Sequence, residues 1–347
     1  MQKSPLGRSN LKVSRYGLGT MTWGGPTPMD IAHGQIDRAL AHGINLIDTA
    51  EIYPAAPPRA ETVGRSERII GLWFEKNSRR SDVILATQHS GIGQNLVRHG
   101  APIGPETIRD GVEGALRRLR TDYIDLFQFH WPNRDTYHKR GAEPAVAHRP
   151  DPAAIVQTMA DSLGALAVEQ RRGTIRHFGL SNETVWGMAQ WLRLAEAGAG
   201  PRPVSVQNEY SLLCRQHEFD MAELCRNEDL GLLAYAPLAV GLLTGKYQGR
   251  KRLAMARIAL MPDLGGRRTP CAELAVDAYL DIAFKHDLDI VGMALAWVAG
   301  RPTTASVVFG ATDLAQLDRI LSQTDLRLSD AALADIEIAS RAHPMPF

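Results

Sequence analysis

The sequence predicts an α/β protein, and within that class a (β/α)8 TIM barrel with an N-terminal hairpin and long loops at the C-terminal face. Two observations support this fold: short apolar runs rich in β-branched residues recur eight times, and segments with helical spacing separate most of them. Strands that alternate with helices form right-handed βαβ units in a parallel sheet, and eight such units favour a closed barrel. Because barrels of this kind occupy chains of 347 residues as one domain, we expect a single domain spanning 1–347.

The chain opens with KSPLGRSNLKVSR at residues 3–15, which predicts a hairpin around a Gly-Arg-Ser-Asn turn that covers the bottom of the barrel. The predicted barrel strands follow at 16–20, 44–50, 82–87, 122–130, 175–181, 203–209, 230–238 and 304–311. Predicted helices lie at 30–43, 106–119, 153–172, 183–198, 216–228 and 313–322. In the first helix, Ile31, Ile36 and Leu40 can share one face, and Gly43 is typical of the position just past a helix end.

Charge and hydropathy argue against several kinds of partner. The chain has 39 basic and 38 acidic residues, a net charge of +1, so its overall charge attracts neither nucleic acid nor an anionic membrane. The sequence contains neither a signal-peptide apolar region nor an apolar run long enough to span a bilayer, so we expect a cytoplasmic protein. Its three cysteines form no CxxC motif, which argues against a zinc site and a disulfide framework. The sequence gives no sign of an oligomeric state.

Polar side chains concentrate where the predicted strands end. Active sites of such barrels lie at the C-terminal ends of the strands, so these residues are the candidates for chemistry. They are Thr20, Met21, Asp48, Gln88, His130, Ser181, Asn182, Gln207, Asn208, Tyr235 and the segment 310–312. In the run ILATQHS, Gln88 and His89 should point to opposite sides of their strand, because strand side chains alternate.

Eight segments in order give the chain a resemblance to the aldo-keto reductase family, and within it to the bacterial Tas-like branch. They are GLGTMTWG, GINLIDTAEIYP, GRSERIIG, LRRLRTDYIDLFQFHWP, GTIRHFGLSNET, VQNEYSLL, APLAVGLLTGKY and VVFGATDLAQLDRI. The resemblance covers nearly the whole chain. It implies reduction of a small aldehyde or ketone with NADP(H), bound without a Rossmann fold, and no G-x-G-x-x-G motif follows a predicted strand.

The resemblance also implies a catalytic set of Asp, Tyr, Lys and His. Asp48, Tyr53 and His130 match three of these positions, whereas the Lys position is Gln88. In the family the Lys cation favours the tyrosinate and lowers the pKa of the proton-donating Tyr. Gln88 can donate a hydrogen bond to the phenolic oxygen but carries no charge, and an ionised Asp48 would raise the pKa of Tyr53.

Several interpretations of Gln88 stay open. The enzyme has diverged, and His130, protonated or through water, supplies the proton for a narrower or more reactive set of carbonyls. Alternatively, Gln88 is an engineered substitution that silences the enzyme. Alternatively, catalysis is weak or lost and a nicotinamide-binding regulatory or interaction protein remains, as in potassium-channel β subunits of this fold. Redox-neutral chemistry such as epimerisation, with the cofactor recycled in place, is a further possibility.

The remaining site residues follow from the resemblance. It assigns to the cofactor Thr20, Met21, Asp48, Ser181, Asn182, Gln207, Tyr235, Pro237, Leu238, Gly241, Lys246, Arg257, Gly310, Thr312, Gln316 and Arg319. Ser181, Asn182 and Gln207 would bind the nicotinamide carboxamide, and Tyr235 would stack on its ring. The segment 237–246 would strap over the pyrophosphate, with Lys246 as its charge.

A helix N-terminus after residue 310 would receive a phosphate, and Arg257 or Arg319 would clamp the 2′-phosphate of NADPH. Trp23, Tyr53 and Trp131 would form the walls of the substrate site, and the polar stretch 133–152 reads as a lid at its rim. His138 and His148 lie in that stretch, but their spacing fits no metal motif, so no metal is assigned.

Overall fold

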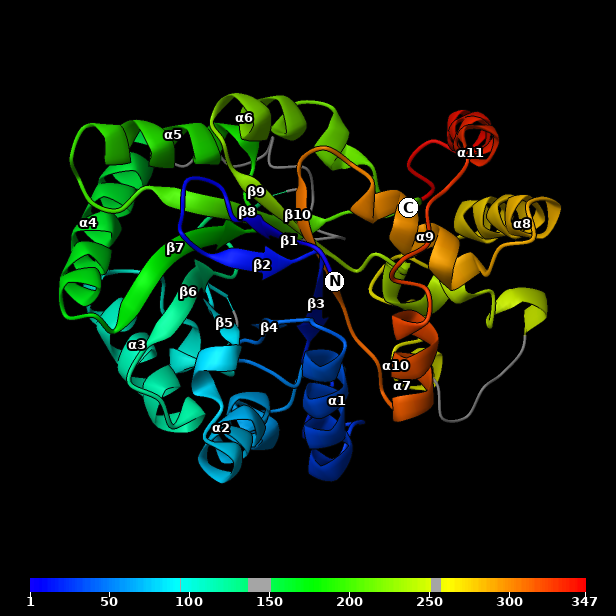
Figure 1. Cartoon of the computed structure of the whole chain (residues 1–347). Coiled ribbons are helices and arrows are strands. Elements are labelled where there is room, and N and C mark those ends of the chain that lie inside the picture. The colour runs from blue at the N-terminus through cyan, green and yellow to red at the C-terminus, as the bar shows by residue number, and fades with distance from the viewer. Residues whose placement is uncertain (94, 137–150, 251–256) are drawn as a thin grey trace.

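The computed structural model describes residues 1–93, 95–136, 151–250 and 257–347, and its centre is a closed barrel of eight parallel strands (Figure 1). The strands are β3 (Tyr16–Gly19), β4 (Leu46–Asp48), β5 (Ile84–His89), β6 (Ile124–Phe129), β7 (Ile175–Ser181), β8 (Pro203–Glu209), β9 (Gly231–Tyr235) and β10 (Thr304–Phe309). The first barrel strand pairs with the last, because β3 lies beside β10, and this closes the ring. The predicted (β/α)8 fold is therefore confirmed.

A two-stranded hairpin lies across the N-terminal end of the barrel (Figure 1). Its strands are β1 (Lys3–Pro5) and β2 (Lys12–Ser14), which pair in antiparallel fashion. Leu6, Leu11 and Val13 are buried among apolar residues that fill the lower barrel interior. Gly7 has φ +53°, and a Cβ there would lie 2.3 Å from the carbonyl oxygen of Val204, so only glycine fits this approach. The predicted hairpin is confirmed.

Helices surround the barrel. They are α1 (Met29–Ala41), α2 (Arg65–Asn77), α3 (Pro105–Leu119), α4 (Pro152–Arg171), α5 (Val185–Glu196), α6 (Met221–Asn227), α7 (Arg257–Leu260), α8 (Pro270–Lys285), α9 (Ile290–Ala299), α10 (Leu314–Leu321) and α11 (Asp330–Ala342). Side-chain caps fix several starts: Asp151, Thr184 and Asp313 accept hydrogen bonds from the first turns of α4, α5 and α10. The predicted helix 216–228 is shorter, since a 3-10 turn at Gln216–Glu218 precedes α6.

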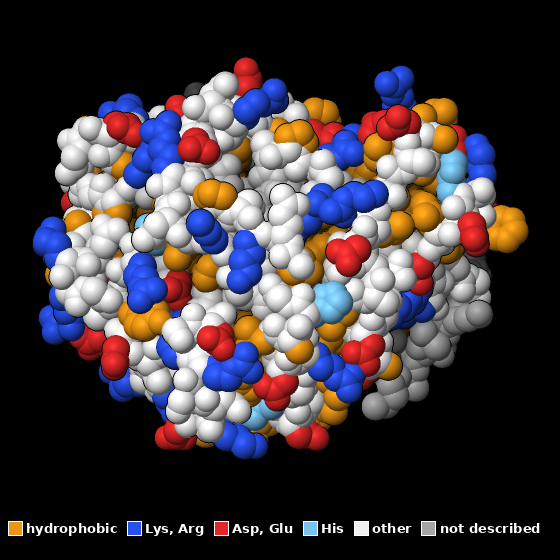
Figure 2. All heavy atoms as spheres, viewed as in Figure 1, with side chains coloured by type: hydrophobic (Ala, Val, Ile, Leu, Met, Phe, Trp, Pro, Cys, Tyr) orange, Lys and Arg blue, Asp and Glu red, His pale blue; other side chains and the backbone are white. Residues whose placement is uncertain are grey.

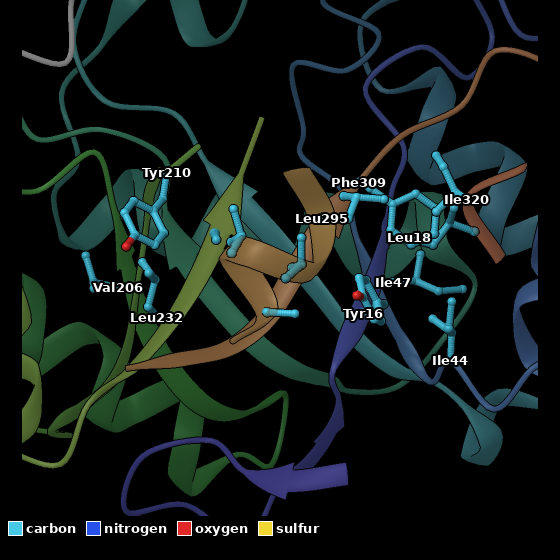
Figure 3. Packing of buried hydrophobic residues seen from close by; sticks show 14 of the residues in the cluster. Tyr16, Leu18, Ile44, Ile47, Val206, Tyr210, Leu232, Leu295, Phe309 and Ile320 are labelled. Atoms are coloured by element: carbon cyan, nitrogen blue, oxygen red, sulfur yellow. The ribbon is translucent and has the colours of Figure 1, made fainter. Parts of the chain in front are cut away.

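The hydrophobic core lies between the barrel and its helices. Outward-facing strand residues such as Leu18, Ile47 and Phe309 pack beneath this helical layer (Figure 3). On the visible outer face, acidic and basic side chains are interspersed (Figure 2). None of the helices that the structure describes is long and apolar enough to span a membrane.

Alternation along β5 decides which side chains reach the barrel interior. His89 faces outward onto α3, where a Cβ on Gly111 would lie 2.3 Å from His89 Nδ1. Its neighbour Gln88 is therefore directed into the barrel, where it contacts Asp48. The predicted opposition of Gln88 and His89 is confirmed.

Candidate active site

Four buried side chains from four strands meet inside the C-terminal end of the barrel. Asp48 ends β4, and three glutamine amides surround its carboxyl group: Gln88 on β5, Gln128 on β6 and Gln207 on β8. Gln207 Nε2 donates to Asp48 Oδ1 at 2.8 Å and Gln128 Nε2 donates to the same oxygen at 3.2 Å. Gln88 Nε2 lies 3.2 and 3.1 Å from the two carboxyl oxygens and also donates to Gln207 Oε1 at 3.0 Å. We call these four residues the amide cage.

The charge state of Asp48 follows from this environment. Burial raises the pKa of Asp48 to about 7, although hydrogen bonds from Gln207, Gln128 and Gln88 act in the opposite direction. Among the described residues, no Lys or Arg contributes to this shift of the Asp48 pKa. At neutral pH the carboxyl group is consequently close to half protonated, whereas an adjacent cation would keep it ionised.

Tyr53 and His130 lie together above the cage. Their ring centroids are 5.6 Å apart with an interplanar angle of 79°. Burial raises the pKa of Tyr53 well above its ordinary value, with further increases from Asp48 and Tyr235 and a smaller opposing effect of Arg257. Burial lowers the pKa of His130 to about 4, against a small effect of Glu51. Both residues are therefore neutral at pH 7, so protonated His130, one of the sequence-based interpretations, is disfavoured.

A buried ion pair fixes the segment that carries Tyr53. Glu51 accepts hydrogen bonds from Ser90 N and Arg98 Nη1, each at 2.5 Å, and Arg98 Nη2 donates to Ser90 O at 2.7 Å. Burial alone would raise the pKa of Glu51, but His89 and Arg98 hold it well below its ordinary value. This pair anchors the segment after β4 to the segment after β5.

Sequence reasoning missed three residues of this region. Gln128 could have been found, because it stands two positions before His130 and strand alternation turns both to the same side. Glu51 and Arg98 form their pair across 47 residues of sequence, so no local pattern identifies it.

The predicted nicotinamide contacts form one connected group. Ser181 Oγ donates to Gln207 O at 2.8 Å, and Asn182 Nδ2 donates to His130 O at 2.8 Å. The hydroxyl of Tyr235 donates to Asn182 Oδ1 at 2.7 Å. Asn182 adopts φ +53°, a left-handed conformation that asparagine tolerates better than most residues. The structure thus joins β7, β8 and β9 beside the cage.

Thr20 and Met21, at the exit of β3, lie next to the same region. Thr20 N donates to Asp48 O at 3.0 Å, and its buried Oγ1 has no hydrogen-bond partner among the described residues. Met21 O accepts from Ala55 N at 3.0 Å, which ties the β3 exit to the segment that follows Tyr53.

The loop after β9 brings a second group of predicted residues together. Pro237 and Leu238 lead into a turn in which Gly241 has φ +105°. A Cβ on Gly241 would lie 3.4 Å from Lys246 Cε. Burial lowers the pKa of Lys246, Arg257 acts in the same direction and Asp313 opposes them. These interactions put Lys246 and Arg257 in one electropositive region near the start of α10.

The start of α10 is closed by its own side chains. Gln316 Oε1 accepts from both the backbone N and the Oγ1 of Thr312 at 3.1 Å, and Asp313 caps the helix. Gly310 precedes this turn, and a Cβ there would lie 3.4 Å from Gly19 O. Arg319 is engaged elsewhere, since its Nε and Nη2 lie 2.9 and 2.8 Å from Asp289 Oδ2.

Of the predicted substrate residues, one is misplaced. Trp23 is fully buried and donates from Nε1 to Gln35 Oε1 at 2.9 Å, so it is a core residue and not part of an open wall. This corrects the prediction, which placed Trp23 in the substrate wall because it follows a barrel strand. The prediction did not take into account that helix α1 covers this side chain. Trp131 is partly buried beside His130, with ring centroids 4.7 Å apart, and donates to Ile92 O at 3.0 Å.

The predicted lid at 133–152 is described only at its ends. Residues 137–150, which include His138 and His148, lie outside the described residues. At the first end, Arg134 pairs with the buried Glu183 and donates to Thr184 Oγ1 at 3.1 Å. Within the described ranges, no group of three or more His, Cys, Asp or Glu side chains could hold a metal ion.

Comparison with known proteins agrees with this arrangement. The family model described as Aldo/keto reductase family matches residues 15–341. Protein tas of Escherichia coli (strain K12) is 41% identical, covering all of this chain and 99% of that protein. The NADH-specific methylglyoxal reductase of the same organism is 27% identical over 95% of this chain and 96% of its own length. A probable voltage-gated potassium channel subunit beta of Arabidopsis thaliana is 28% identical over 99% of this chain and 98% of its own. The chain belongs to the aldo-keto reductase family, in its Tas-like branch.

Proposed function

We propose that this protein catalyses the reversible, NADP(H)-dependent reduction of a small aldehyde or ketone. The observation that carries the proposal is the grouping of Tyr53, His130 and Asp48 beside the connected side chains of Ser181, Asn182 and Gln207. Family membership supports oxidoreductase chemistry, and the name of the methylglyoxal reductase relative suggests small reactive aldehydes.

The residues at the barrel mouth fit a nicotinamide cofactor. A primary amide has two N–H groups and two acceptor positions, and Gln207 uses one of each within the amide cage. The other N–H and acceptor position suit a carboxamide. Tyr235 offers a partly exposed ring, while Lys246 and Arg257 offer positive charge for phosphates. When bound, the cofactor supplies the hydride.

Tyr53 is the proposed proton donor. Its phenol stays protonated at neutral pH, so it can donate to the carbonyl oxygen as negative charge develops there. His130 is neutral, and its buried Nδ1 has no hydrogen-bond partner among the described residues. A neutral imidazole has one N–H, so with Nδ1 unprotonated the Nε2–H can donate to the same carbonyl oxygen. Residue 88, where the family has Lys, is the uncharged Gln88, so no cation at this position lowers the pKa of Tyr53. Turnover should therefore be slow with unactivated carbonyls and faster with reactive aldehydes.

A cofactor-binding regulatory protein with little catalysis is the second candidate. The observation that favours it is the neutral amide of Gln88 at the position where the family carries Lys, together with relatives named as potassium channel subunits. This candidate predicts tight nicotinamide binding without turnover.

The deciding experiment measures binding and turnover separately. NADPH and NADH are titrated by fluorescence, and oxidation of the reduced cofactor is then followed with methylglyoxal and nitrobenzaldehyde. We expect binding and slow turnover, with turnover reduced at least about 100-fold by Tyr53→Phe. Tyr16→Phe is the matched control, because the Tyr16 hydroxyl is buried in the core without a partner among the described residues. Binding without turnover across the panel would favour the regulatory protein, and failure to bind either cofactor would exclude both candidates.

A further inference from the structure

The amide cage contains suitable partners for both charge states of Asp48. For the ionised carboxylate, three amide N–H groups donate. For the protonated acid, acceptors are also at hand, since Gln88 Oε1 and Gln128 Oε1 are buried and have no hydrogen-bond donor among the described residues. Rotation of one amide by a half turn exchanges its N–H for its oxygen, so Gln88 or Gln128 can turn an acceptor toward a carboxyl proton on Asp48.

The cage also reaches the nicotinamide site. Gln207 donates to Asp48 with the shortest bond of the cage, 2.8 Å, and accepts from Gln88 at 3.0 Å. Its remaining N–H and acceptor position are those assigned above to the carboxamide. Any ligand that fixes this amide therefore also fixes the orientation of Gln88 around Asp48.

We propose that Asp48 is the charge-balancing group of this site: it keeps a proton beside the reduced, neutral nicotinamide and releases it beside the oxidised, positively charged one. Gln128 acts as a positioning residue that holds the carboxyl group in place for both states. This inference rests on the proposed function, because it requires a nicotinamide next to Gln207. The oxidised ring would then supply the cation that the amide of Gln88 lacks.

Other charged and titratable groups around Asp48 are accounted for. Tyr53 follows on the same segment and stays protonated at neutral pH, because burial raises its pKa well above its ordinary value, and Tyr235 lies across the barrel on β9. His130 at the end of β6 is neutral above pH about 4. Glu209 at the end of β8 is held by a bidentate pair with Arg267, at 2.8 and 2.7 Å.

Further charged and titratable groups lie on the β5 side and on the loop after β9. On the β5 side, His89 and Glu51 contact each other, and Glu51 is neutralised by Arg98. Arg257 on α7 acts on Tyr53 and on Lys246. Among these titratable groups, Asp48 is the one whose side chain accepts a hydrogen bond from Gln207, the residue proposed to contact the nicotinamide.

The test counts protons without requiring catalysis. Binding of NADP+ and of NADPH is measured at pH 7 by calorimetry in two buffers of different ionisation enthalpy, which gives the number of protons released per cofactor bound. Because Asp48 is close to half protonated at pH 7, we expect NADP+ to release up to about half a proton and NADPH to take up a fraction of one. The ratio of the two dissociation constants should accordingly change by up to about tenfold per pH unit through this range, tighter for NADP+ at higher pH.

Variants assign the proton to its residue. Asp48→Asn should abolish the difference in proton release between NADP+ and NADPH. Asp37→Asn should leave that difference unchanged, because the Asp37 carboxyl lies on the outer helices, where it accepts from Trp73 Nε1. Gln128→Leu, which removes one donor to the ionised form, should move the midpoint of proton release upward by about one pH unit. It also serves as the second test if Asp48→Asn does not fold.

The outcomes separate the inference from the function on which it rests. Binding of both cofactors with equal proton counts overturns the inference and leaves the reductase proposal standing. The same is true if Asp48→Asn releases as many protons as the unchanged protein. If neither cofactor binds, the proposed function fails and the inference fails with it.

Discussion

Arg98 and Glu51 form a buried ion pair, with Arg98 Nη1 2.5 Å from Glu51 Oε2, and Glu51 stands two residues before Tyr53 in the sequence. The side chain of Glu51 is only 7% exposed and that of Arg98 17% exposed. Because Glu51 also accepts from Ser90 N, a single carboxylate holds the segment after β4 against the segment after β5. The position of the candidate proton donor thus depends on a pair that takes no part in the chemistry.

The first prediction is that Arg98→Met destabilises the protein by about 3 kcal/mol, since it leaves Glu51 buried and unpaired. Urea unfolding monitored by circular dichroism measures the change. Arg38→Met is the matched control: its pair with Asp318 is exposed, so the expected loss is below about 1 kcal/mol. Equal losses for the two variants would show that the Glu51 pair is no stronger than a surface contact.

The second prediction concerns the pH dependence of stability through Asp48. Its native pKa is raised to about 7, whereas an unfolded Asp titrates near 3.9, so between these values the native state holds a proton that the unfolded state has lost. The free energy of unfolding therefore falls by about 1.4 kcal/mol per pH unit through this window from this group alone and levels off above it.

Asp48→Asn removes that contribution. The stability of the variant relative to the unchanged protein should rise between pH 4.5 and pH 7.5, by on the order of 3 kcal/mol. Denaturant unfolding at both pH values gives the difference, with Asp37→Asn as control. A relative stability that stays constant with pH would mean that the native Asp48 carboxyl is ionised throughout.

The third prediction separates the two tryptophans. Trp23→Ala should cost about 3–5 kcal/mol of stability, because it removes a fully buried ring and its bond to Gln35. Trp131→Ala should cost less, about 1–2 kcal/mol, because Trp131 is only partly buried, and should raise KM for an aromatic aldehyde about tenfold, because its ring lies beside His130. Thermal unfolding and steady-state kinetics distinguish these effects. A large stability loss for Trp131→Ala with unchanged KM would contradict the assignment.

The fourth prediction concerns the proposed preference for NADPH over NADH. Arg257→Ala should weaken NADPH binding about tenfold or more and affect NADH much less, since one charge-assisted contact to a phosphate is lost. Arg319→Ala should change either affinity less than about threefold, because Arg319 already donates to Asp289. Fluorescence titration of both cofactors with both variants is the measurement. A larger effect of Arg319→Ala would reverse the assignment.

Much of the fold was predictable because strand length, composition and spacing are local properties. All eight barrel strands and the hairpin lie where the pattern predicted them. Helix α9 was missed for a physical reason: all ten of its residues are buried, so it shows no alternation between an apolar and a polar face. Helix α11 did carry a signal, since Ala332, Ile336 and Ala339 recur at helical spacing.

The candidate site was predictable only in part. Strand ends and the family resemblance identified Asp48, Gln88 and Gln207, but not that their side chains bond to one another. Those contacts depend on the barrel register, which places β4, β5 and β8 around one interior. Trp23 was misjudged because burial by α1 is a tertiary effect that the sequence near residue 23 does not reveal.

Ring closure between β3 and β10 has a consequence for the chain while it is being synthesised. The edge of β3 finds its partner only when residues 304–309 have left the ribosome, after all seven other barrel strands have been made. The hairpin is made before the barrel strands, but the apolar cluster in which it is buried is complete only when Val204 and Ala305 have been added. Between the synthesis of β3 and that of β10, the nascent chain therefore carries an unpaired strand edge and exposed leucines, the features that holding chaperones bind.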